Sequence, residues 1–435
     1  MNRRAINLPL AFAAFLLPLL THAQTDAVTT PPATVDLATV LRLARESSPR
    51  LTLARQGIAG AEAERITAGA YPNPSVSYGR FRPRGGQATL FDGSRQEQMT
   101  FDIPLLIAGQ RSARVDKADL EIDAARARVA AGTSTLAAEA GSAYVALQAA
   151  QEKSALLSAT RAELERLRNI VAGREESGMA SRYDVTRMDV ELGAATSRLD
   201  EARADIADRS GQLAALLGFP GWQPRASGAL AALQLADMPP SPPRDIATSS
   251  PALRSALSEE KVAESAVELA QRERWPTPSI SVGRSWTSDP FGSANFLGFS
   301  VEIPLLDTRR GALKKAESDA RAARLRRSLV ETEVRTNLER YSAMIAARRA
   351  ALQSHDQGAA RQLPALKQMA EDAYRLGRGM VFDLLDATRA RLELQQTRVE
   401  LLASLIDAQL RYLAISGRLD QLPVQTVGET PTKRD

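Results

Sequence analysis

The sequence predicts a mainly helical chain with membrane β-strands, built from two copies of a unit that contains a strand hairpin and long coiled-coil helices. Tyr71–Gly79 recurs as Trp275–Gly283, and each copy has an aromatic residue and two prolines followed by apolar residues that alternate with serine. Apolar residues then recur every seven positions, which is typical of coiled coils. Only 5% of the 435 residues are aromatic, which favours long helices over a thick globular core.

Four short segments show the period-two alternation of strands with one apolar and one polar face. The expected strands are about 74–81, 96–104, 278–286 and 295–304. In the last of them Phe299 and Val301 alternate with Ser300 and Glu302. We therefore predict that Phe299 and Val301 face lipid, whereas Ser300 and Glu302 face a lumen. A length of about eight to ten residues suits a tilted membrane-spanning strand.

Long helices are expected after each hairpin. Their approximate ranges are 106–174, 181–217, 306–375 and 381–416. At 1.5 Å per residue the first would be on the order of 100 Å long, which is far more than a globular helix needs. Pro364 lies inside the third helix and is expected to kink it or to mark a break.

The N-terminus has the features of a cleaved signal peptide over residues 1–23, because Arg3 and Arg4 precede an apolar run that ends before Ala23. A transmembrane anchor is the alternative, but the run is short and contains two prolines. The other expected parts are the first repeat 24–218, a Pro- and Gly-rich linker 219–248, the second repeat 249–422 and a flexible tail 423–435.

Composition excludes several classes of function. The chain has no cysteine, which excludes disulfides, thiolate metal sites and a lipid attached to an N-terminal cysteine. Removing Arg3 and Arg4 with the signal peptide lowers the formal charge from +5 to +3, too little to suggest nucleic-acid binding. His355 is the only histidine after the signal peptide and is interpreted as a surface or packing residue. We expect no cofactor, no metal site and no enzymatic activity.

The isolated hairpins would leave unpaired strand edges, so several copies are expected to close the sheet. Eight strands from two copies would enclose a filled interior, whereas twelve from three copies would leave room for a channel. With a signal peptide and no long apolar helix in the mature chain, this favours a homotrimer in the lipid of a bacterial outer membrane. The alternative is a soluble periplasmic coiled-coil protein that carries hairpins.

The duplicated layout, the Tyr-Pro-Asn-Pro start of the first strand region and the Ile-Pro-Leu strand ends resemble the TolC family of outer-membrane efflux proteins, over nearly the whole mature chain. The segment Tyr374–Thr388 is similar to that family's second periplasmic turn and gate. The resemblance implies a trimeric 12-stranded β-barrel continued by a periplasmic α-helical barrel. It also implies a periplasmic adaptor protein and an inner-membrane pump of the resistance-nodulation-division type as partners.

The general pattern is similar to the branch of the family that serves heavy-metal cation exporters. A drug-efflux or type I secretion duct of the same fold remains open. A soluble periplasmic coiled-coil adaptor is the alternative from a different class.

The candidate gate lies next to the second helical turn. Asp383 and Asp386 are three residues apart and so share one face of a helix. From the residues alone, such a pair at a helix start favours capping and dipole compensation. The resemblance instead implies a constricting ring of aspartates, with Tyr374 and Asp184 as the hydrogen-bonding partners that hold the tip closed.

The two helical turns are the candidate contact sites for the adaptor. The residues that the resemblance implies are Gly178, Met179, Ser181, Gly377 and Arg378. Glycine is also what any helical hairpin requires, so a purely structural role is the alternative. Gly379 occupies the position at which the best-known member of that family has a gate arginine, and Arg378 lies beside it.

Overall fold

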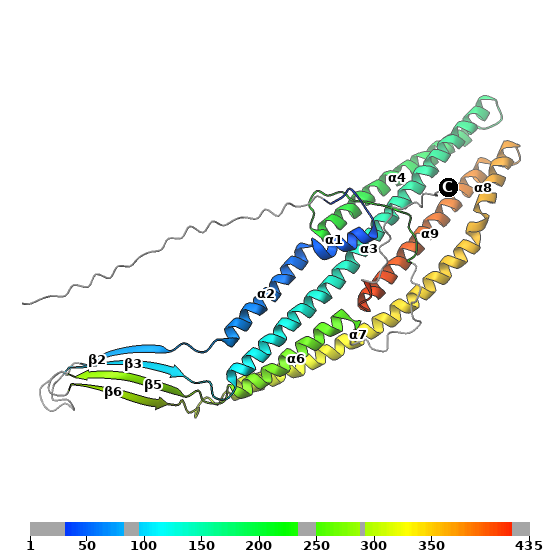
Figure 1. Ribbon diagram of the computed structural model, residues 1–435. Helices are drawn as coiled ribbons and strands as arrows, with labels where there is room; N and C mark the ends of the chain where they lie inside the picture. Colours follow the sequence, from blue (N-terminus) through cyan, green and yellow to red (C-terminus); the bar gives the residue numbers. More distant parts are fainter. Residues whose placement is uncertain (1–30, 82–94, 234–248, 288–291, 420–435) are drawn as a thin grey trace, which may run out of the picture. The chain divides into compact units, whose positions relative to one another are not determined.

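The computed structural model describes residues 31–81, 95–233, 249–287 and 292–419. The predicted signal peptide, residues 234–248 of the linker and the predicted tail lie outside the described residues. The elements, in order, are β1 (Thr34–Val35), α1 (Leu37–Glu46), α2 (Pro49–Gly69), β2 (Ser75–Phe81), β3 (Gln96–Pro104), α3 (Gln110–Glu176), α4 (Arg182–Leu217), β4 (Arg225–Ala226), α6 (Pro251–Arg272), β5 (Ser279–Thr287), β6 (Ser293–Ser300), α7 (Arg310–Gln357), α8 (Ala359–Arg375) and α9 (Val381–Ile415) (Figure 1).

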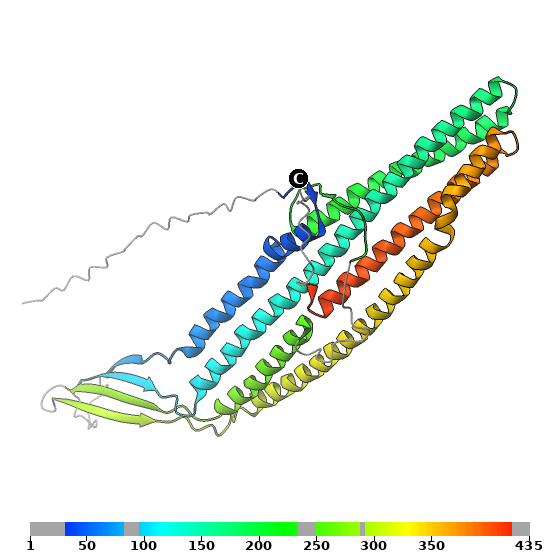
Figure 2. The same cartoon turned by 45° about the vertical axis from the view of Figure 1, so that its right-hand side comes forward.

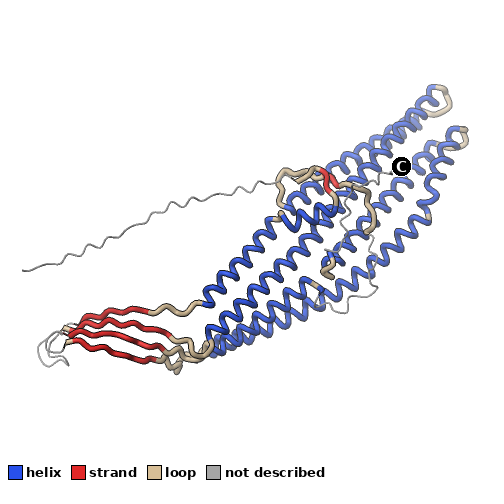
Figure 3. Tube along the Cα trace, viewed as in Figure 1, coloured by secondary structure: helices blue, strands red, loops and turns tan. Residues whose placement is uncertain are grey.

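The two hairpins form one antiparallel sheet with the strand order β2-β3-β5-β6, as Figure 3 shows. Because paired residues share a face, the pairings define two contrasting rows across the sheet. One row is apolar and consists of Val76, Phe101, Val282 and Leu297. The row on the opposite face is small and polar and consists of Ser75, Asp102, Ser281 and Gly298. At these rows one face of the sheet is therefore suited to lipid and the other to water. Toward the hairpin ends the same face as Val76 carries charged side chains, namely Arg80, Glu97 and Arg284.

The last strand is shorter than predicted. β6 ends at Ser300, so Val301 and Glu302 lie outside the strand, although Phe299 is on the apolar face as expected. The strand ends there because the residues after Ser300 have no partner strand in the described part of the chain. Ser300 pairs with Ser279, which is the first residue of β5. The corresponding strand β3 continues to Pro104 because its last residues pair with β5 on its other side.

Beside the sheet, helices α2, α3, α6 and α7 lie next to one another in the same order as the strands they flank (Figures 1 and 2). Beyond them α3 continues as one helix and packs against α4 and α9, while α8 packs against α9. Among the described residues, no helix is both long and apolar enough to cross a membrane.

The predicted third long helix is divided into α7 and α8, and the break lies at Gly358 rather than at Pro364. Gly358 has φ −90° and ψ −123°, and a Cβ atom there would lie 2.8 Å from the Ser354 carbonyl oxygen. The chain changes direction where no side chain obstructs it. Pro364 lies inside α8 and does not mark the break, which lies six positions earlier; a kink at Pro364 stays a prediction.

The largest core cluster lies where α1, α3, α4 and α9 meet. The segment after α4 crosses α3 there and is held by side chains of α3. Tyr144 donates a hydrogen bond to the Ser227 carbonyl at 2.8 Å, and Gln148 donates one to the Gly228 carbonyl at 3.0 Å. Burial raises the pKa of Tyr144 to about 12, so the phenol remains a donor at every physiological pH.

Candidate functional site

The two helical turns lie at the same end of the helices, away from the sheet (Figures 1 and 2). Gly178 in the α3–α4 turn and Gly377 in the α8–α9 turn both have φ of +73°, a conformation that L side chains rarely adopt. Met179 and Ser181 follow in the first turn, and Arg378 follows in the second. The structure thus places the predicted contact residues in two matching turns, and their glycines have a structural reason.

Asp184 stabilises the start of α4. The Ser181 N–H donates to Asp184 Oδ2 at 3.1 Å, and the Asp184 N–H donates to Ser181 Oγ at 3.2 Å. This reciprocal arrangement is a capping box. Asp383 has the equivalent place in α9, where its Oδ2 accepts from the Met380 N–H at 2.8 Å. For Asp383 this hydrogen bond agrees with the helix-start alternative, and Asp184 has the same role at the start of α4.

Asp386 differs from Asp383 because it lies one turn further along α9 and is exposed. Its charge acts on Arg389. The pKa of Arg389 is raised, mainly by the hydrogen bond to Glu191 and also by the charge of Asp386. Asp386 is therefore the member of the pair whose carboxylate is not used to start the helix.

Tyr374 is buried in the apolar cluster near the turns, and Arg174 lies against it. The Arg174 guanidinium is 4.8 Å from the centre of the Tyr374 ring, and its Nη1 donates to the Tyr374 carbonyl at 2.7 Å. Burial raises the pKa of Tyr374; Arg174 opposes this shift and the charge of Asp184 adds to it. The charge of Asp184 thus acts on Tyr374, and so does Arg174, which the sequence did not indicate.

Gly379 closes the second turn tightly. A Cβ atom at this position would lie 3.1 Å from the Tyr374 nitrogen and 3.2 Å from Ala373. An arginine here would require the turn to shift. Arg174, which reaches the same turn from α3, is the arginine that holds it in this chain.

A cluster of charged side chains, missed by the sequence reasoning, joins α3 to α8 and α9. Glu163 of α3 forms ion pairs with Arg391 of α9 and, at 3.0 Å, with Lys367 of α8. Arg166 of α3 lies 2.8 Å from Glu371 of α8. Burial lowers the pKa of Arg391, and its buried Nε has no hydrogen-bond partner. A buried carboxylate between two cations makes this contact specific.

A second ion pair joins α4 to α9. Arg389 Nε donates to Glu191 Oε1 at 3.0 Å, and the Glu191 side chain is only 8% exposed, whereas that of Arg389 is 46% exposed. The hydrogen bond from Arg389 holds the pKa of Glu191 below its usual value. We call Glu163, Arg391, Lys367, Glu191 and Arg389 the charged clasp, because they join the helices of the first repeat to those of the second.

His355 is a packing residue. Its Nε2 donates to the Leu394 carbonyl of α9 at 2.9 Å, and its Nδ1 lies 3.1 Å from Asp356. Among the described residues, no group of three or more carboxylate, histidine or thiol side chains is placed to hold a metal ion.

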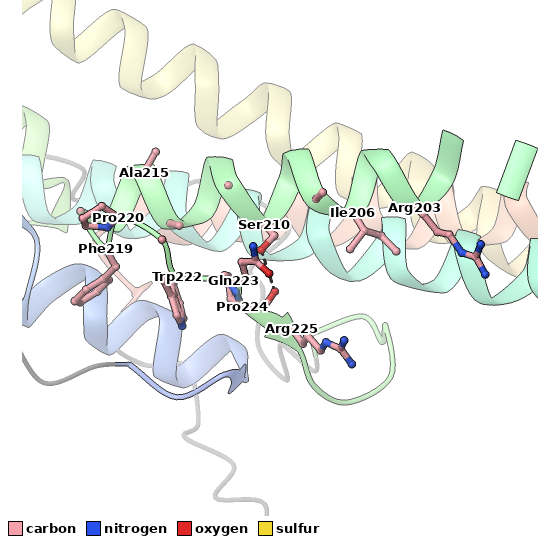
Figure 4. A pocket seen from close by; sticks show the side chains of 15 residues that line it. Arg203, Ile206, Ser210, Ala215, Phe219, Pro220, Trp222, Gln223, Pro224 and Arg225 are labelled. Atoms are coloured by element: carbon pink, nitrogen blue, oxygen red, sulfur yellow. Dashed lines mark hydrogen bonds between the residues drawn. The ribbon is translucent and has the colours of Figure 1, made fainter. Parts of the chain in front are cut away.

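A groove lies at the end of α4, away from the turns (Figure 4). It has a volume of about 710 Å³ and is bordered by α4 and by residues 219–225. Phe219 and Trp222 meet edge to face there, with ring centres 5.7 Å apart, and Ser210 Oγ donates to the Pro224 carbonyl at 3.3 Å (Figure 4). The groove forms where the linker leaves the first repeat.

A sheet with one exposed apolar face, continued by long helices that end in two matched turns, defines the class of outer-membrane channels with a periplasmic helical extension. The chain belongs to the outer membrane efflux protein family, whose model matches residues 40–219 and 243–418. The two matched segments correspond to the two repeats. The protein is therefore an efflux channel of the outer membrane and not an enzyme, as the TolC-family resemblance implied. Channels of this family form trimers that work with efflux systems.

Relatives and solved structures agree with this family. The chain is 25% identical to the cobalt-zinc-cadmium resistance protein CzcC of Cupriavidus metallidurans, over 96% of this chain and 97% of that protein. It is 24% identical to the pyoverdine export outer membrane protein OpmQ of Pseudomonas putida, over 88% of this chain and 86% of that protein. The crystal structure of the Campylobacter jejuni CmeC outer membrane channel has the same fold, with a TM-score of 0.76, 14% identity and coverage of 88% and 86%.

Proposed function

We propose that three copies of this chain form a duct through the outer membrane, which passively conducts substrates that an inner-membrane pump delivers through a periplasmic adaptor. The observation that carries this proposal is the contrast between the two faces of the sheet. An exposed apolar row opposite a row of serine, aspartate and glycine requires lipid on one side and water on the other. A closed barrel of twelve strands satisfies both requirements.

Exposed tryptophans lie before β5 and near its end. Trp275 precedes β5 and Trp286 lies near its end, eleven positions later, and both side chains are exposed. Eleven residues span roughly 36 Å when extended and about 25 Å across the membrane at a tilt near 45°. Tryptophan prefers the membrane interfaces, so this spacing supports a barrel that crosses the bilayer.

The turns supply the surface for the adaptor. The proposed contact residues are Gly178, Met179, Ser181, Gly377 and Arg378. Several large apolar side chains are exposed at or close to these turns. These are Met179, Tyr183, Leu376, Met380 and Phe382. Exposed apolar residues concentrated at one end of a helical surface favour contact with another protein. We assign that contact to the periplasmic adaptor, with a pump of the resistance-nodulation-division type behind it.

Heavy-metal cations are the proposed substrates, because one relative that the chain matches over nearly its full length is a cobalt-zinc-cadmium resistance protein. Export of organic molecules is the second candidate, because the pyoverdine exporter is almost equally similar. Deleting the gene and comparing sensitivity to metals, dyes and detergents separates the two. Increased sensitivity to cobalt, zinc and cadmium alone supports the first, and increased sensitivity to dyes and detergents alone supports the second.

The gate is proposed at Asp386, Asp383, Tyr374 and Asp184, and the structure suggests how to separate their roles. Asp386→Asn removes a charge without removing a helix cap, so block of single channels by divalent cations should weaken several-fold while the trimer stays intact. Asp319→Asn, an exposed carboxylate of α7, is the control. If divalent cations block the parent, Asp386→Asn and Asp319→Asn channels equally, Asp386 is not part of the gate.

A further inference from the structure

The sheet of one chain has two open edges. Within the described residues, no strand pairs with the outer side of β2 or of β6. Large apolar side chains are also exposed on the helices that flank these edges. They are Leu53 and Ile66 on α2, and Leu325 and Leu329 on α7. Unpaired edges and exposed apolar side chains on the same two flanks indicate surfaces that another chain covers.

The internal duplication shows how such an edge is covered. Inside one chain, β3 of the first repeat pairs with β5 of the second repeat, from Gln96 with Thr287 to Pro104 with Ser279. After the strand, the Leu105 N–H donates to the Pro278 carbonyl at 2.7 Å. The counterparts of β3 and β5 in the other repeats are β6 and β2, which are the two open edges.

The segment after β6 has the features of an interface without its partner. Leu305 and Leu306 are 80% and 102% exposed, whereas their first-repeat counterparts Leu105 and Leu106 are half-buried. The Leu305 N–H bonds only locally, to the Ile303 carbonyl at 2.8 Å. In the first repeat, Pro278 directly before β5 supplies the acceptor for the Leu105 N–H, and among the described residues Leu305 has no such long-range bond.

We infer that residues 301–304 become the last part of β6 when a second copy of this chain pairs with it in one defined register. Transferring the β3–β5 register to the outer edges pairs Glu302 with Ser77 of the partner subunit. The same register pairs Pro304 with Ser75 of the partner subunit and brings the Leu305 N–H to the carbonyl of Pro74 of the partner subunit. This inference rests on the proposed trimeric barrel and specifies its subunit contact.

The geometry of a closed barrel supports this register. Within one chain, Ser75 pairs with Asp102, Asp102 with Ser281 and Ser281 with Gly298. The inferred pairing then joins Gly298 to Phe81 of the partner subunit, which lies six residues further along β2 than Ser75. Six residues per subunit over twelve strands give a tilt of about 45°, with about 3.3 Å per residue and 4.8 Å between strands. A slip of two residues would give about 35° or about 55°, so the two repeats, rather than the tilt alone, select the register.

Cysteine pairs test the register directly, because the chain has no cysteine of its own. Glu302→Cys combined with Ser77→Cys in the full-length protein, in outer membranes, should give covalent dimers and trimers on oxidation. Asp102→Cys with Ser281→Cys is the matched control, because these residues pair between β3 and β5 as Glu302 and Ser77 are inferred to pair between subunits. Their disulfide should form within one chain. Glu302→Cys with Ser75→Cys or with Gly79→Cys should give at least tenfold less covalent oligomer.

If most covalent oligomer forms with Ser75→Cys or Gly79→Cys in place of Ser77→Cys, the register is wrong but the trimer stands. No covalent oligomer from any combination, when the control pair closes, would show that these edges do not meet. A parent protein without a heat-modifiable trimer would overturn the proposed duct itself. Amide hydrogen exchange is the independent readout, since the amides of Val301, Ile303 and Leu305 face the partner strand in this register, and they should be protected in the trimer and exchange at least tenfold faster in detergent-dissociated monomers.

Discussion

The two repeats differ in the residue that precedes the first long helix. Gly109 and Arg309 occupy the same place before α3 and α7, and both have a left-handed backbone, with φ of +74° and +53°. Arginine in this conformation is strained. Arg309 is held by two contacts, since its N–H donates to Asp307 at 2.9 Å and its side chain donates to the Glu273 carbonyl at 2.7 Å. The second repeat thus keeps the left-handed backbone at this position, although it has arginine there in place of glycine.

The ends of the return helices, in contrast, are the same in both repeats. Gly218 after α4 and Gly417 after α9 have φ of +82° and +70°. Gly218 lies against Pro49 at the start of α2, and Gly417 lies against Ser249 and Pro251 at the start of α6. Contacts of this closeness exclude any side chain, whereas a helix start can be satisfied in several ways. Close backbone packing therefore restricts the sequence of the two repeats more than helix capping does.

The largest effect is therefore expected for Gly417→Ala. The new Cβ would lie 2.1 Å from the Ser249 carbonyl oxygen, and the backbone would be strained, so we expect a loss of about 2–4 kcal/mol in the free energy of unfolding. Gly218→Ala should lose slightly less, because its Cβ would meet the Pro49 ring at 2.5 Å. The measurement is the temperature at which the trimer dissociates in detergent.

Gly193→Ala is the control for both variants, since α4 leaves open space at that helical position. It should leave stability unchanged or raise it by up to about 1 kcal/mol. Equal dissociation temperatures for Gly417→Ala and Gly193→Ala would contradict the view that the ends of the return helices are fixed by packing.

Local sequence patterns were sufficient to predict the elements that depend on local patterns. Alternation located the strands, and the Pro and Gly positions located the turns. The capping box is also visible as Ser181 followed three residues later by Asp184. The end of β6 was not predictable in this way, because pairing with another strand decides where a strand ends.

The charged clasp was not predictable because its members are distant in the sequence. Glu163 and Arg391 are 228 positions apart, and both are surrounded by many other charged residues on helices. Only the packing of α3 against α9 selects this pair. The break at Gly358 was missed for a related reason, since Pro364 has the stronger local effect but Gly358 is where the chain turns.

An intermediate effect is expected for Glu191→Gln, which weakens the connection between the two repeats. The pKa of Glu191 is lowered in the folded chain, so its ion pair contributes stability above the ordinary pKa of glutamate and loses it as the pH falls through the lowered value. The parent channel should therefore open more readily in acid. Because Arg389 is half-exposed, we expect the variant to lose about 1–2 kcal/mol of this contact and most of the pH dependence.

Single-channel conductance recorded from pH 7 to pH 3 measures this prediction. Glu165→Gln is the control, since Glu165 forms an exposed pair with Arg161 within α3 and does not join the repeats. A conductance that depends on pH in the same way in the parent and in Glu191→Gln would show that this pair does not hold the helices together.

The smallest effect is expected for Met380→Ser, which gives the second repeat the cap of the first. Met380 is 75% exposed and precedes α9 without a hydroxyl, whereas Ser181 completes a capping box before α4. Because Asp383 already accepts from the Met380 N–H, a serine hydroxyl would add the reciprocal bond and stabilise the start of α9 by about 0.5–1 kcal/mol. Amide exchange over Val381–Leu385 should slow about two- to fivefold. Ser181→Ala should accelerate exchange at the start of α4 by a similar factor, and unchanged exchange in both variants would mean that packing alone fixes the two turns.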